Sequence, residues 1–316
     1  MMKPLLTAAL AVLLSAFPAL AEWTYVDGGG KTVTLPETPK RIVAHANVAA
    51  GLIPLGIRPV GIYVDGPVKD DPSLRGLDLT GIEILGEAWG EIDIEKAAAL
   101  QPDLVIAEYW PLDTAWSGGE AVTGPQSPLR ALAPITGVTN ADSILELIID
   151  YEALAASLGA DLANPGLAAD KAAFEAAKAA FQAATAAKPN LTALAVWAGT
   201  DALYVAAPAG SAELMDFKTW GLGLIVPELA EDRGYWEILS WENADKYQPD
   251  LVIVDNRSPA TIETAKAQPT WTSIKAVETG AIADWPAFWL RNYRAYATAL
   301  DQLTAAITAA DENLTH

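Results

Sequence analysis

The chain contains no cysteine and only two histidines, His45 and His316, among its 316 residues. It therefore cannot build a closed Cys/His zinc site, an iron-sulfur cluster, a disulfide or a thiol nucleophile. No resident cofactor is expected, and any metal must arrive on a ligand or be held by carboxylates. Basic residues are also scarce, since 20 Lys and Arg face 40 Asp and Glu, which gives a net charge of -20. A surface this acidic repels phosphates and anionic lipid headgroups, so nucleic-acid binding and membrane-surface binding are not expected.

The N-terminus is typical of a secretory signal peptide. Lys3 precedes an apolar run over residues 5–17, and a small-x-small cleavage site follows at residues 19–21. The run is shorter than the ~20 residues that a bilayer span requires, and no later segment is long and apolar enough to insert into a membrane. With no cysteine at the cleavage site, a lipid anchor is not expected. We interpret residues 1–21 as a signal peptide and predict an exported, soluble protein.

An internal repeat is the most informative feature of the sequence. Residues 89–107 and 236–254 each have a Trp at the first position, a Glu six residues later and the run Gln-Pro-Asp-Leu-Val-Ile starting twelve residues after the Trp. Each copy predicts an N-cap, a short helix, a turn and a buried strand. Strands and helices alternate in both halves, which favours two α/β lobes with parallel sheets.

An alanine-rich segment lies between the two copies of the repeat. Residues 166–188 carry Phe174 and Phe181 seven positions apart, and their composition predicts a helix about 30 Å long. An ordinary surface helix would have the same composition, but the position between the repeats favours a connector. We therefore expect two Rossmann-like α/β lobes, residues 22–165 and 189–316, joined by a single long backbone helix. Such a connector permits only small hinge motions between the lobes.

Aromatic and basic side chains cluster near the expected strand ends, where open α/β folds bind their ligands. Aromatic walls suit a large, partly apolar ligand, and guanidinium groups suit anionic oxygens. The histidine that follows the first strand fits either a ligand contact or a structural role. The candidate ligand-binding residues are His45, Trp89, Tyr109, Trp110, Trp197, Trp236, Arg257, Trp289, Arg291 and Tyr293.

Glu95 and Glu242 occupy equivalent places in the two copies of the repeat. Each is expected in a first helical turn, where the helix dipole alone favours a carboxylate. As a pair they would suit a two-fold symmetric partner with basic sockets. A glycoside hydrolase would need its two carboxyl groups about 5 to 10 Å apart, which placement on separate lobes disfavours. A serine hydrolase is not indicated, because no G-x-S-x-G motif is present.

Several stretches of the chain match the motifs of a known family. They are residues 31–36, 39–44, 55–61, 95–106 and 241–254, together with the long alanine-rich helix. In these the chain resembles the periplasmic substrate-binding proteins of ABC importers for ferric siderophores, haem and cobalamin. The resemblance implies two lobes with a shallow cleft between them and limited closure on binding. It also implies that Glu95 and Glu242 dock onto arginines of the permease dimer, and that Trp89 and Trp236 lie on the cleft walls.

The function expected from the sequence is that of a non-enzymatic periplasmic receptor. It would bind a ferric siderophore as a monomer and deliver it to an inner-membrane ABC importer, since a siderophore supplies the oxygen ligands of its own iron. Aromatic stacking and Arg contacts would provide affinity. Haem, with His45 or a Tyr as axial ligand, and cobalamin remain alternative ligands. A secreted carboxylate-pair glycoside hydrolase remains the alternative from a different class.

Overall fold

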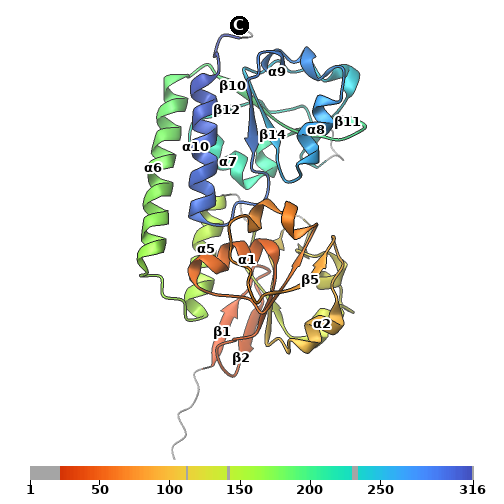
Figure 1. Cartoon of the computed structure of the whole chain (residues 1–316), viewed down its shortest axis with the longest axis vertical. Coiled ribbons are helices and arrows are strands. Elements are labelled where there is room, and N and C mark those ends of the chain that lie inside the picture. Colours follow the sequence, from red (N-terminus) through yellow and green to blue (C-terminus); the bar gives the residue numbers. More distant parts are fainter. Residues whose placement is uncertain (1–21, 112, 141–142, 230–233, 315–316) are drawn as a thin grey trace, which may run out of the picture.

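The computed structural model describes residues 22–111, 113–140, 143–229 and 234–314, so the expected signal peptide lies outside the described residues. Two α/β lobes lie one above the other, and one long helix runs beside both (Figure 1). This helix, α6 (Pro165–Ala187), has 23 residues and begins one position before the predicted connector. Across the described ranges, no helix is both long enough and apolar enough to cross a membrane.

The N-terminal lobe is built on a five-stranded sheet in which all neighbouring strands are parallel. Its central strands are buried along their whole length, as expected when helices cover both faces of a parallel sheet. In spatial order the strands are β5 (Glu83–Glu87), β4 (Gly61–Val64), β3 (Ile42–His45), β6 (Leu104–Ile106) and β9 (Ile135–Thr136). The α-helices of this lobe are α1 (Ala46–Leu52), α2 (Ile94–Ala99), α3 (Glu120–Thr123), α4 (Pro128–Leu132) and α5 (Ile144–Ser157).

Shorter elements complete this lobe. An antiparallel hairpin opens the described chain, and a second one follows β6. Their strands are β1 (Trp23–Val26), β2 (Thr32–Leu35), β7 (Tyr109–Trp110) and β8 (Ala115–Trp116). The 3-10 turns are η1 (Ile53–Leu55), η2 (Val68–Asp70) and η3 (Pro72–Leu74).

The sheet of the C-terminal lobe is mixed, so the expectation of a wholly parallel sheet was wrong for this lobe. Its strands are β13 (Trp236–Ser240), β11 (Ala202–Ala206), β10 (Thr192–Ala198), β14 (Leu251–Asp255) and β15 (Ile282–Trp285), with β12 (Gly223–Leu224) beside β10. Strand β11 is antiparallel to both of its neighbours. The reason is the link of residues 199–201 between β10 and β11, which is too short for a crossover helix and therefore forms a hairpin.

Four α-helices and three 3-10 turns surround this sheet in the described residues. After β11 ends at residue 206, a 3-10 turn precedes the first of these helices. The elements are η4 (Pro208–Gly210), α7 (Ala212–Thr219), η5 (Trp241–Asn243), α8 (Ala260–Lys266), η6 (Trp271–Ser273), α9 (Lys275–Glu278) and α10 (Tyr293–Ala309).

The internal repeat has a structural counterpart in each lobe. In the first copy Asp103 accepts hydrogen bonds from the backbone N–H groups of Lys40 at 2.8 Å and Arg41 at 2.9 Å, just before β3. In the second copy Asp250 accepts one from the N–H of Thr192, the first residue of β10, at 2.8 Å. The repeated Asp therefore ties the same pair of neighbouring parallel strands together, β3 with β6 and β10 with β14.

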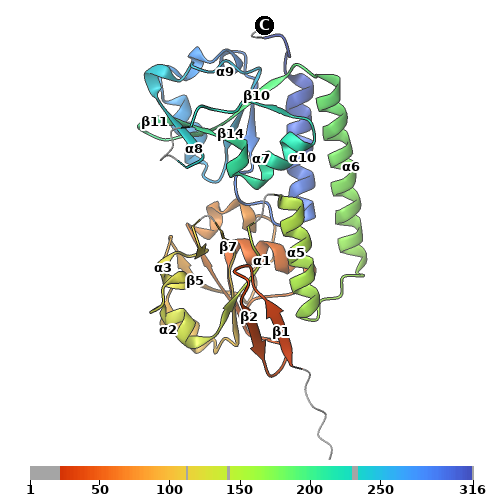
Figure 2. The same ribbon diagram turned by 180° about the vertical axis from the view of Figure 1, so that it is seen from behind.

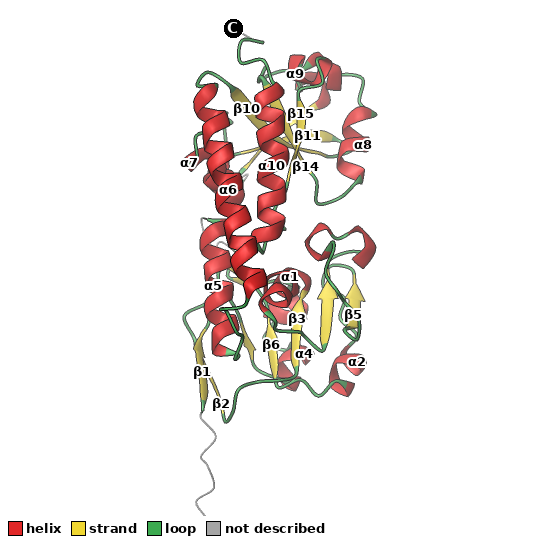
Figure 3. Ribbon diagram, turned by 60° about the vertical axis from the view of Figure 1, so that its left-hand side comes forward, coloured by secondary structure: helices red, strands yellow, loops and turns green. Residues whose placement is uncertain are grey.

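Helices α6 and α10 lie side by side and together form the strut beside the lobes (Figure 3). They run in the same direction, because Arg294 pairs with Asp170 near their starts and Lys188 donates to the carbonyl of Thr308 at 2.7 Å near their ends. Phe174 and Phe181, the two aromatic residues singled out in the sequence, are fully buried. The predicted connector is thus confirmed, and a second helix reinforces it.

The lobes also meet where α7 lies against α5, as the view from behind shows (Figure 2). Asp216 of α7 accepts hydrogen bonds from the backbone N–H of Ile144, the first residue of α5, at 3.0 Å and from the hydroxyl of Tyr296 at 2.8 Å. A carboxylate is well placed at a helix N-terminus, where unpaired N–H groups point outward. One C-terminal-lobe side chain therefore caps a helix of the N-terminal lobe.

Candidate functional site

The segment between β15 and α10, residues 286–292, links the C-terminal lobe to the N-terminal lobe. The side chain of Asn47, in α1, donates to the carbonyl oxygen of Phe288 at 3.3 Å. The side chain of Asn292 donates to the carbonyl oxygen of Ala50, also in α1, at 3.1 Å. This segment, here called the junction loop, therefore holds its tip against the carboxyl end of β3.

Phe288 at the tip of the junction loop is the centre of an aromatic cluster. Its ring centroid lies 6.1 Å from Trp110 of the N-terminal lobe, and 6.0 Å from both Tyr235 and Trp285 of the C-terminal lobe. The guanidinium of Arg257 lies 4.8 Å from the centroid of the Phe288 ring. Side chains from both lobes thus converge on one partly exposed ring.

A second group of aromatic rings continues from this cluster across the sheet of the C-terminal lobe. The ring of Trp236 lies 4.7 Å from Tyr235 and 6.5 Å from Trp197, and Trp197 lies 4.6 Å from Tyr204. All these rings are half-buried, so each keeps part of its surface in solvent. We call this surface the aromatic face, made of Trp110, Trp197, Tyr204, Tyr235, Trp236 and Phe288.

The position of Trp236 within its strand was not predicted from the sequence. Trp236 was expected near a strand end at the ligand-binding edge of its lobe, and in the structure it begins β13 and pairs with Ala206, the last residue of β11. This follows from the antiparallel direction of β11. Tyr204, Tyr235 and Phe288 were missing from the sequence-based candidates, although Tyr235 and Phe288 each adjoin a Trp that was nominated.

Arg257 presents a cation at the edge of the aromatic face. Its Nε lies 2.9 Å from Oδ2 of Asp255, and its side chain remains 43% exposed. Burial opposes the charge, but the hydrogen bonds and the negative charge of Asp255 raise the pKa of Arg257 above its ordinary value. Nearby, the indole N–H of Trp289 donates to Oδ1 of Asn256 at 2.7 Å, which fixes the half-buried Trp289 ring.

Arg291 and Tyr293 were expected to contact a ligand, but their side chains are buried. The Arg291 side chain is completely buried and pairs with both carboxylate oxygens of Glu108, one of which also accepts the hydroxyl hydrogen of Tyr151 at 2.6 Å. Burial alone would raise the pKa of Glu108, but the charge and hydrogen bonds of Arg291 lower it. Tyr293 is buried against Phe174 of α6, with ring centroids 5.5 Å apart.

His45 has a structural environment. It is 2% exposed, its Nδ1 accepts the backbone N–H of Asn47 at 3.3 Å, and its Nε2 lies 3.1 Å from Oδ2 of Asp65. The imidazole therefore caps the start of α1, and of the two roles left open by the sequence the structural one fits its contacts. Tyr109 is half-buried against Trp116, with centroids 5.2 Å apart.

The remaining residues expected to be functional, Trp89, Glu95 and Glu242, lie on exposed surfaces. Trp89 follows β5, is 62% exposed and lies against Gly119. Glu95 is exposed in the first turn of α2, and Glu242 is exposed in η5, where the expected helix is reduced to a single 3-10 turn. Hydrogen bonds from its own backbone N–H and from Ser240 lower the pKa of Glu242. The two glutamates lie on different lobes, which does not support a carboxylate pair around one bond.

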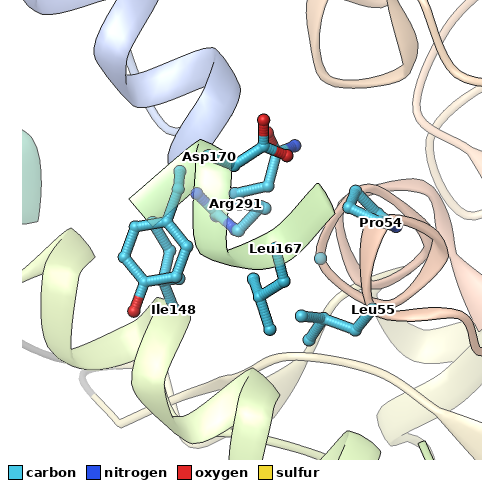
Figure 4. A pocket seen from close by; sticks show the side chains of 9 residues that line it. Pro54, Leu55, Ile148, Leu167, Asp170 and Arg291 are labelled. Carbon is cyan, nitrogen blue, oxygen red and sulfur yellow. The ribbon is translucent and has the colours of Figure 1, made fainter. Parts of the chain in front are cut away.

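Two hollows lie beside the strut. One of about 10 Å³ lies between η1, α5 and α6, and Figure 4 shows Pro54, Leu55, Ile148, Leu167, Asp170 and Arg291 around it. Another of about 400 Å³ lies between β15 and the end of α10. No aromatic-face residue lines either hollow. In the part of the chain that the structure describes, no group of three or more His, Asp or Glu could hold a metal ion.

Comparison with solved structures finds the same architecture in siderophore-binding proteins. DesE, a ferric-siderophore receptor protein from Streptomyces coelicolor, is 33% identical with a TM-score of 0.82, over 92% of this chain and 99% of DesE. The siderophore periplasmic binding protein from the fuscachelin gene cluster of Thermobifida fusca is 22% identical with a TM-score of 0.63, over 85% of this chain and 96% of that one. FhuD2 from Staphylococcus aureus, with bound ferrioxamine B, is 19% identical with a TM-score of 0.60, over 85% and 98%. The last two share the fold.

No curated protein matches the chain. The family model described as periplasmic binding protein matches residues 70–287, which include most of both lobes and the whole of α6. The matched stretch contains β5, the repeated Asp turns and the junction-loop residues up to Ala287. With this match and the similarity to DesE along nearly the whole chain, the protein belongs to the periplasmic binding protein family.

Proposed function

We propose that this protein is a periplasmic receptor that binds a ferric siderophore at the aromatic face and delivers it to an inner-membrane ABC importer. The observation that carries the proposal is the similarity to DesE, a ferric-siderophore receptor protein, at 33% identity over 92% of the chain. The fold shared with FhuD2, which was solved with bound ferrioxamine B, supports the same class of ligand. The protein acts by binding and release, without catalytic turnover.

The chemistry of the aromatic face suits a metal chelate. A ferric siderophore surrounds its iron with its own oxygen atoms, so the receptor does not need to supply metal ligands. The half-buried rings offer flat apolar surface to the organic part of the chelate. Arg257, held in place by Asp255 and still partly exposed, can donate hydrogen bonds to anionic oxygens. Trp110 and Phe288 bring the two lobes together at this surface, so a bound ligand would contact both.

Of the residues expected to bind the ligand, only those with solvent-accessible side chains belong to the proposed contact surface and its surroundings. Trp110, Trp197, Trp236 and Arg257 form the proposed contact surface. Trp289, Tyr109 and Trp89 are assigned to its surroundings, because they are half-buried or exposed near strand ends. Haem ligation through His45 is not proposed, since that imidazole is buried and has neighbours at both nitrogens.

The location and partners form part of the proposal. Residues 1–21 would direct export and be removed, leaving a monomeric protein without a lipid anchor in the periplasm. Glu95 and Glu242, exposed on different lobes, would dock onto the permease dimer. Their charge complements basic sockets, and their repeated sequence context suits a two-fold symmetric partner.

A fluorescence titration tests the proposal. Residues 22–316 would be titrated with ferrioxamine B, a ferric catecholate, a ferric carboxylate siderophore, haem and cobalamin. Saturable quenching by one ferric siderophore class is expected, because a coloured chelate against Trp197 and Trp236 quenches their emission. Saturable binding of haem or cobalamin instead would identify a different ligand, and no binding of any chelate would contradict the proposal.

Variants locate the ligand within the molecule. Trp197→Phe and Trp236→Phe are each expected to reduce the amplitude of quenching. Trp271→Phe is the matched control. Trp271 is 2% exposed and packs against Trp241 in an apolar core of the C-terminal lobe that contains no residue of the aromatic face. If the control removed as much quenching as the aromatic-face variants, the chelate would bind elsewhere.

A further inference from the structure

Glu213 of α7 is a buried carboxylate directly behind the aromatic face. It is 0% exposed, and its Oε1 accepts two hydrogen bonds, from the indole N–H of Trp285 at 3.1 Å and from the backbone N–H of Phe288 at 2.7 Å. Trp285 is also completely buried and lies 6.0 Å from Trp236, ring to ring. One oxygen atom therefore fixes the end of β15 and the tip of the junction loop at once.

Phe288 needs such an anchor, because its backbone is in the left-handed region. Its φ of +63° is unfavourable for a residue with a Cβ and persists only where the surroundings enforce it. The enforcing contacts are the Glu213 bond to its N–H and the Asn47 bond to its carbonyl oxygen. The bond to Glu213 comes from the C-terminal lobe and the bond from Asn47 comes from the N-terminal lobe.

We propose that Glu213 is a positioning residue for ligand capture: through Trp285 and the backbone of Phe288, it holds the Phe288 ring in the place where the two lobes present it to the ligand. The ligand part of this inference rests on the proposed function. Glu213 itself has no exposed surface, so it can affect a ligand only through the groups that it contacts, among them Trp285 and the backbone of Phe288.

Charged and titratable groups face Glu213 from each neighbouring element. Tyr235 precedes β13, Arg257 follows β14, Arg291 lies in the junction loop and Tyr296 lies in α10. Arg257 and Arg291 are paired with Asp255 and Glu108, respectively. Burial raises the pKa of Glu213 above its ordinary value, and the hydrogen bonds and Arg291 only partly oppose this. Because an ionised carboxylate is the stronger acceptor, the hold on Phe288 tightens as Glu213 loses its proton.

The indole N–H resonance of Trp285 reports on this contact without any ligand. In ¹⁵N-labelled protein, it would be assigned by its loss in Trp285→Phe. In the wild type, its chemical shift should follow the titration of Glu213. In Glu213→Gln, which keeps an oxygen acceptor, the resonance should stay near its wild-type position and lose this pH dependence. A wild-type resonance that does not titrate, or one that titrates equally in Glu213→Gln, would overturn the proposal.

Affinity for ferrioxamine B tests the positioning role. Glu213→Ala should weaken binding about tenfold, the effect of losing roughly one net hydrogen bond, while Glu213→Gln should retain affinity within about threefold. Leu214→Ala is the matched control: Leu214 is the next residue of α7 and is equally buried, but its side chain has no hydrogen-bonding group, so its truncation should lower the melting temperature and leave affinity unchanged. Wild-type affinity in Glu213→Ala, or an equal loss in Leu214→Ala, would overturn the proposal.

The two readouts separate this inference from the proposed function. If the wild type binds no ferric chelate, the proposed function fails, and with it the ligand part of the inference. The Trp285 resonance still decides whether Glu213 holds Trp285 and Phe288. If the wild type binds ferrioxamine B and Glu213→Ala binds it equally well, the proposed function stands and the inference fails.

Discussion

Arg291 illustrates how a single residue joins the two lobes. Its guanidinium is buried in the junction loop and pairs with Glu108, which lies 183 residues away in the N-terminal lobe. Two buried charges remain in the interior only because each neutralises the other and the hydroxyl of Tyr151 satisfies the carboxylate further. Removing one partner therefore leaves the other as an uncompensated buried charge.

We predict that Arg291→Ala lowers the free energy of unfolding by about 3 to 5 kcal/mol, the usual cost of stranding one member of a buried pair. Urea denaturation of residues 22–316 measures it. Arg294→Ala is the matched control, three residues along the chain, since Arg294 is 73% exposed in its pair with Asp170. An exposed pair contributes only about 0 to 1 kcal/mol. Equal losses in the two variants would show that the Arg291 pair stabilises no more than a surface contact.

The ionisation of Glu213 predicts a pH dependence of stability. Its pKa is raised in the folded protein from the ordinary value of 4.5, so the folded state binds this proton more tightly than the unfolded state. Stability from this group is complete below pH 4.5 and is lost as the pH rises through the folded-state pKa. Glu213→Gln cannot ionise. Its melting temperature relative to the wild type should therefore increase from pH 4 to neutral pH, and a constant difference between the two proteins would contradict this.

At the scale of elements, close packing around the turn η4 shapes the aromatic face. A Cβ placed on Gly210, the last residue of η4, would lie 2.2 Å from Cγ of Tyr235. Tyr235 in turn lies against Trp236 and Phe288. The absence of a side chain at Gly210 therefore allows the ring of Tyr235 to occupy its place in the aromatic face.

We predict that Gly210→Ala displaces Tyr235, lowers the free energy of unfolding by about 1 to 3 kcal/mol and weakens ferrioxamine B binding. Thermal unfolding and the fluorescence titration measure the two effects. Gly66→Ala is the control, since a Cβ there would meet nothing within 4 Å. If Gly210→Ala behaved like the control, Tyr235 would have room to move without consequence for the face.

The sequence predicted elements with a strong local signal and missed those decided by distant contacts. The alanine-rich composition placed α6 to within one residue at either end. The expected helix from residue 241 is only a 3-10 turn, because the buried Trp241 donates its indole N–H to the carbonyl of Gly199, 42 residues away, and packs edge-to-face on Trp271. Tertiary contacts of this kind override helix propensity.

The candidate site shows the same division. Trp110, Trp197, Trp236 and Arg257 were found because aromatic and basic residues near strand ends are visible in the sequence. The guanidinium of Arg291 was expected to be accessible to an anionic ligand, because its partner Glu108 is 183 residues away in the chain and gives no local signal. Glu213 carried no local signal, because its importance depends on Trp285 and Phe288, which are brought to it only by folding.

At the scale of the whole molecule, the strut and the lobe contacts determine how the receptor can move. Helices α6 and α10 are packed together along the strut, and the junction loop and Asp216 add hydrogen bonds between the lobes. Closure around a ligand is therefore expected to be small. Glu95 and Glu242, the residues proposed to dock onto the permease, are exposed on the two lobes.

We predict that reversing both charges, Glu95→Lys with Glu242→Lys, abolishes importer-dependent uptake of the ferric chelate, because two acidic contacts become repulsive toward basic sockets of the permease. Chelate affinity should stay within about twofold, since neither glutamate belongs to the aromatic face. Glu120→Lys with Glu278→Lys is the control, with one exposed residue on each lobe and the same change in net charge. Uptake by the first double variant at the control's rate would show that these glutamates do not dock the receptor, whereas loss of uptake in both would indicate a general effect of charge.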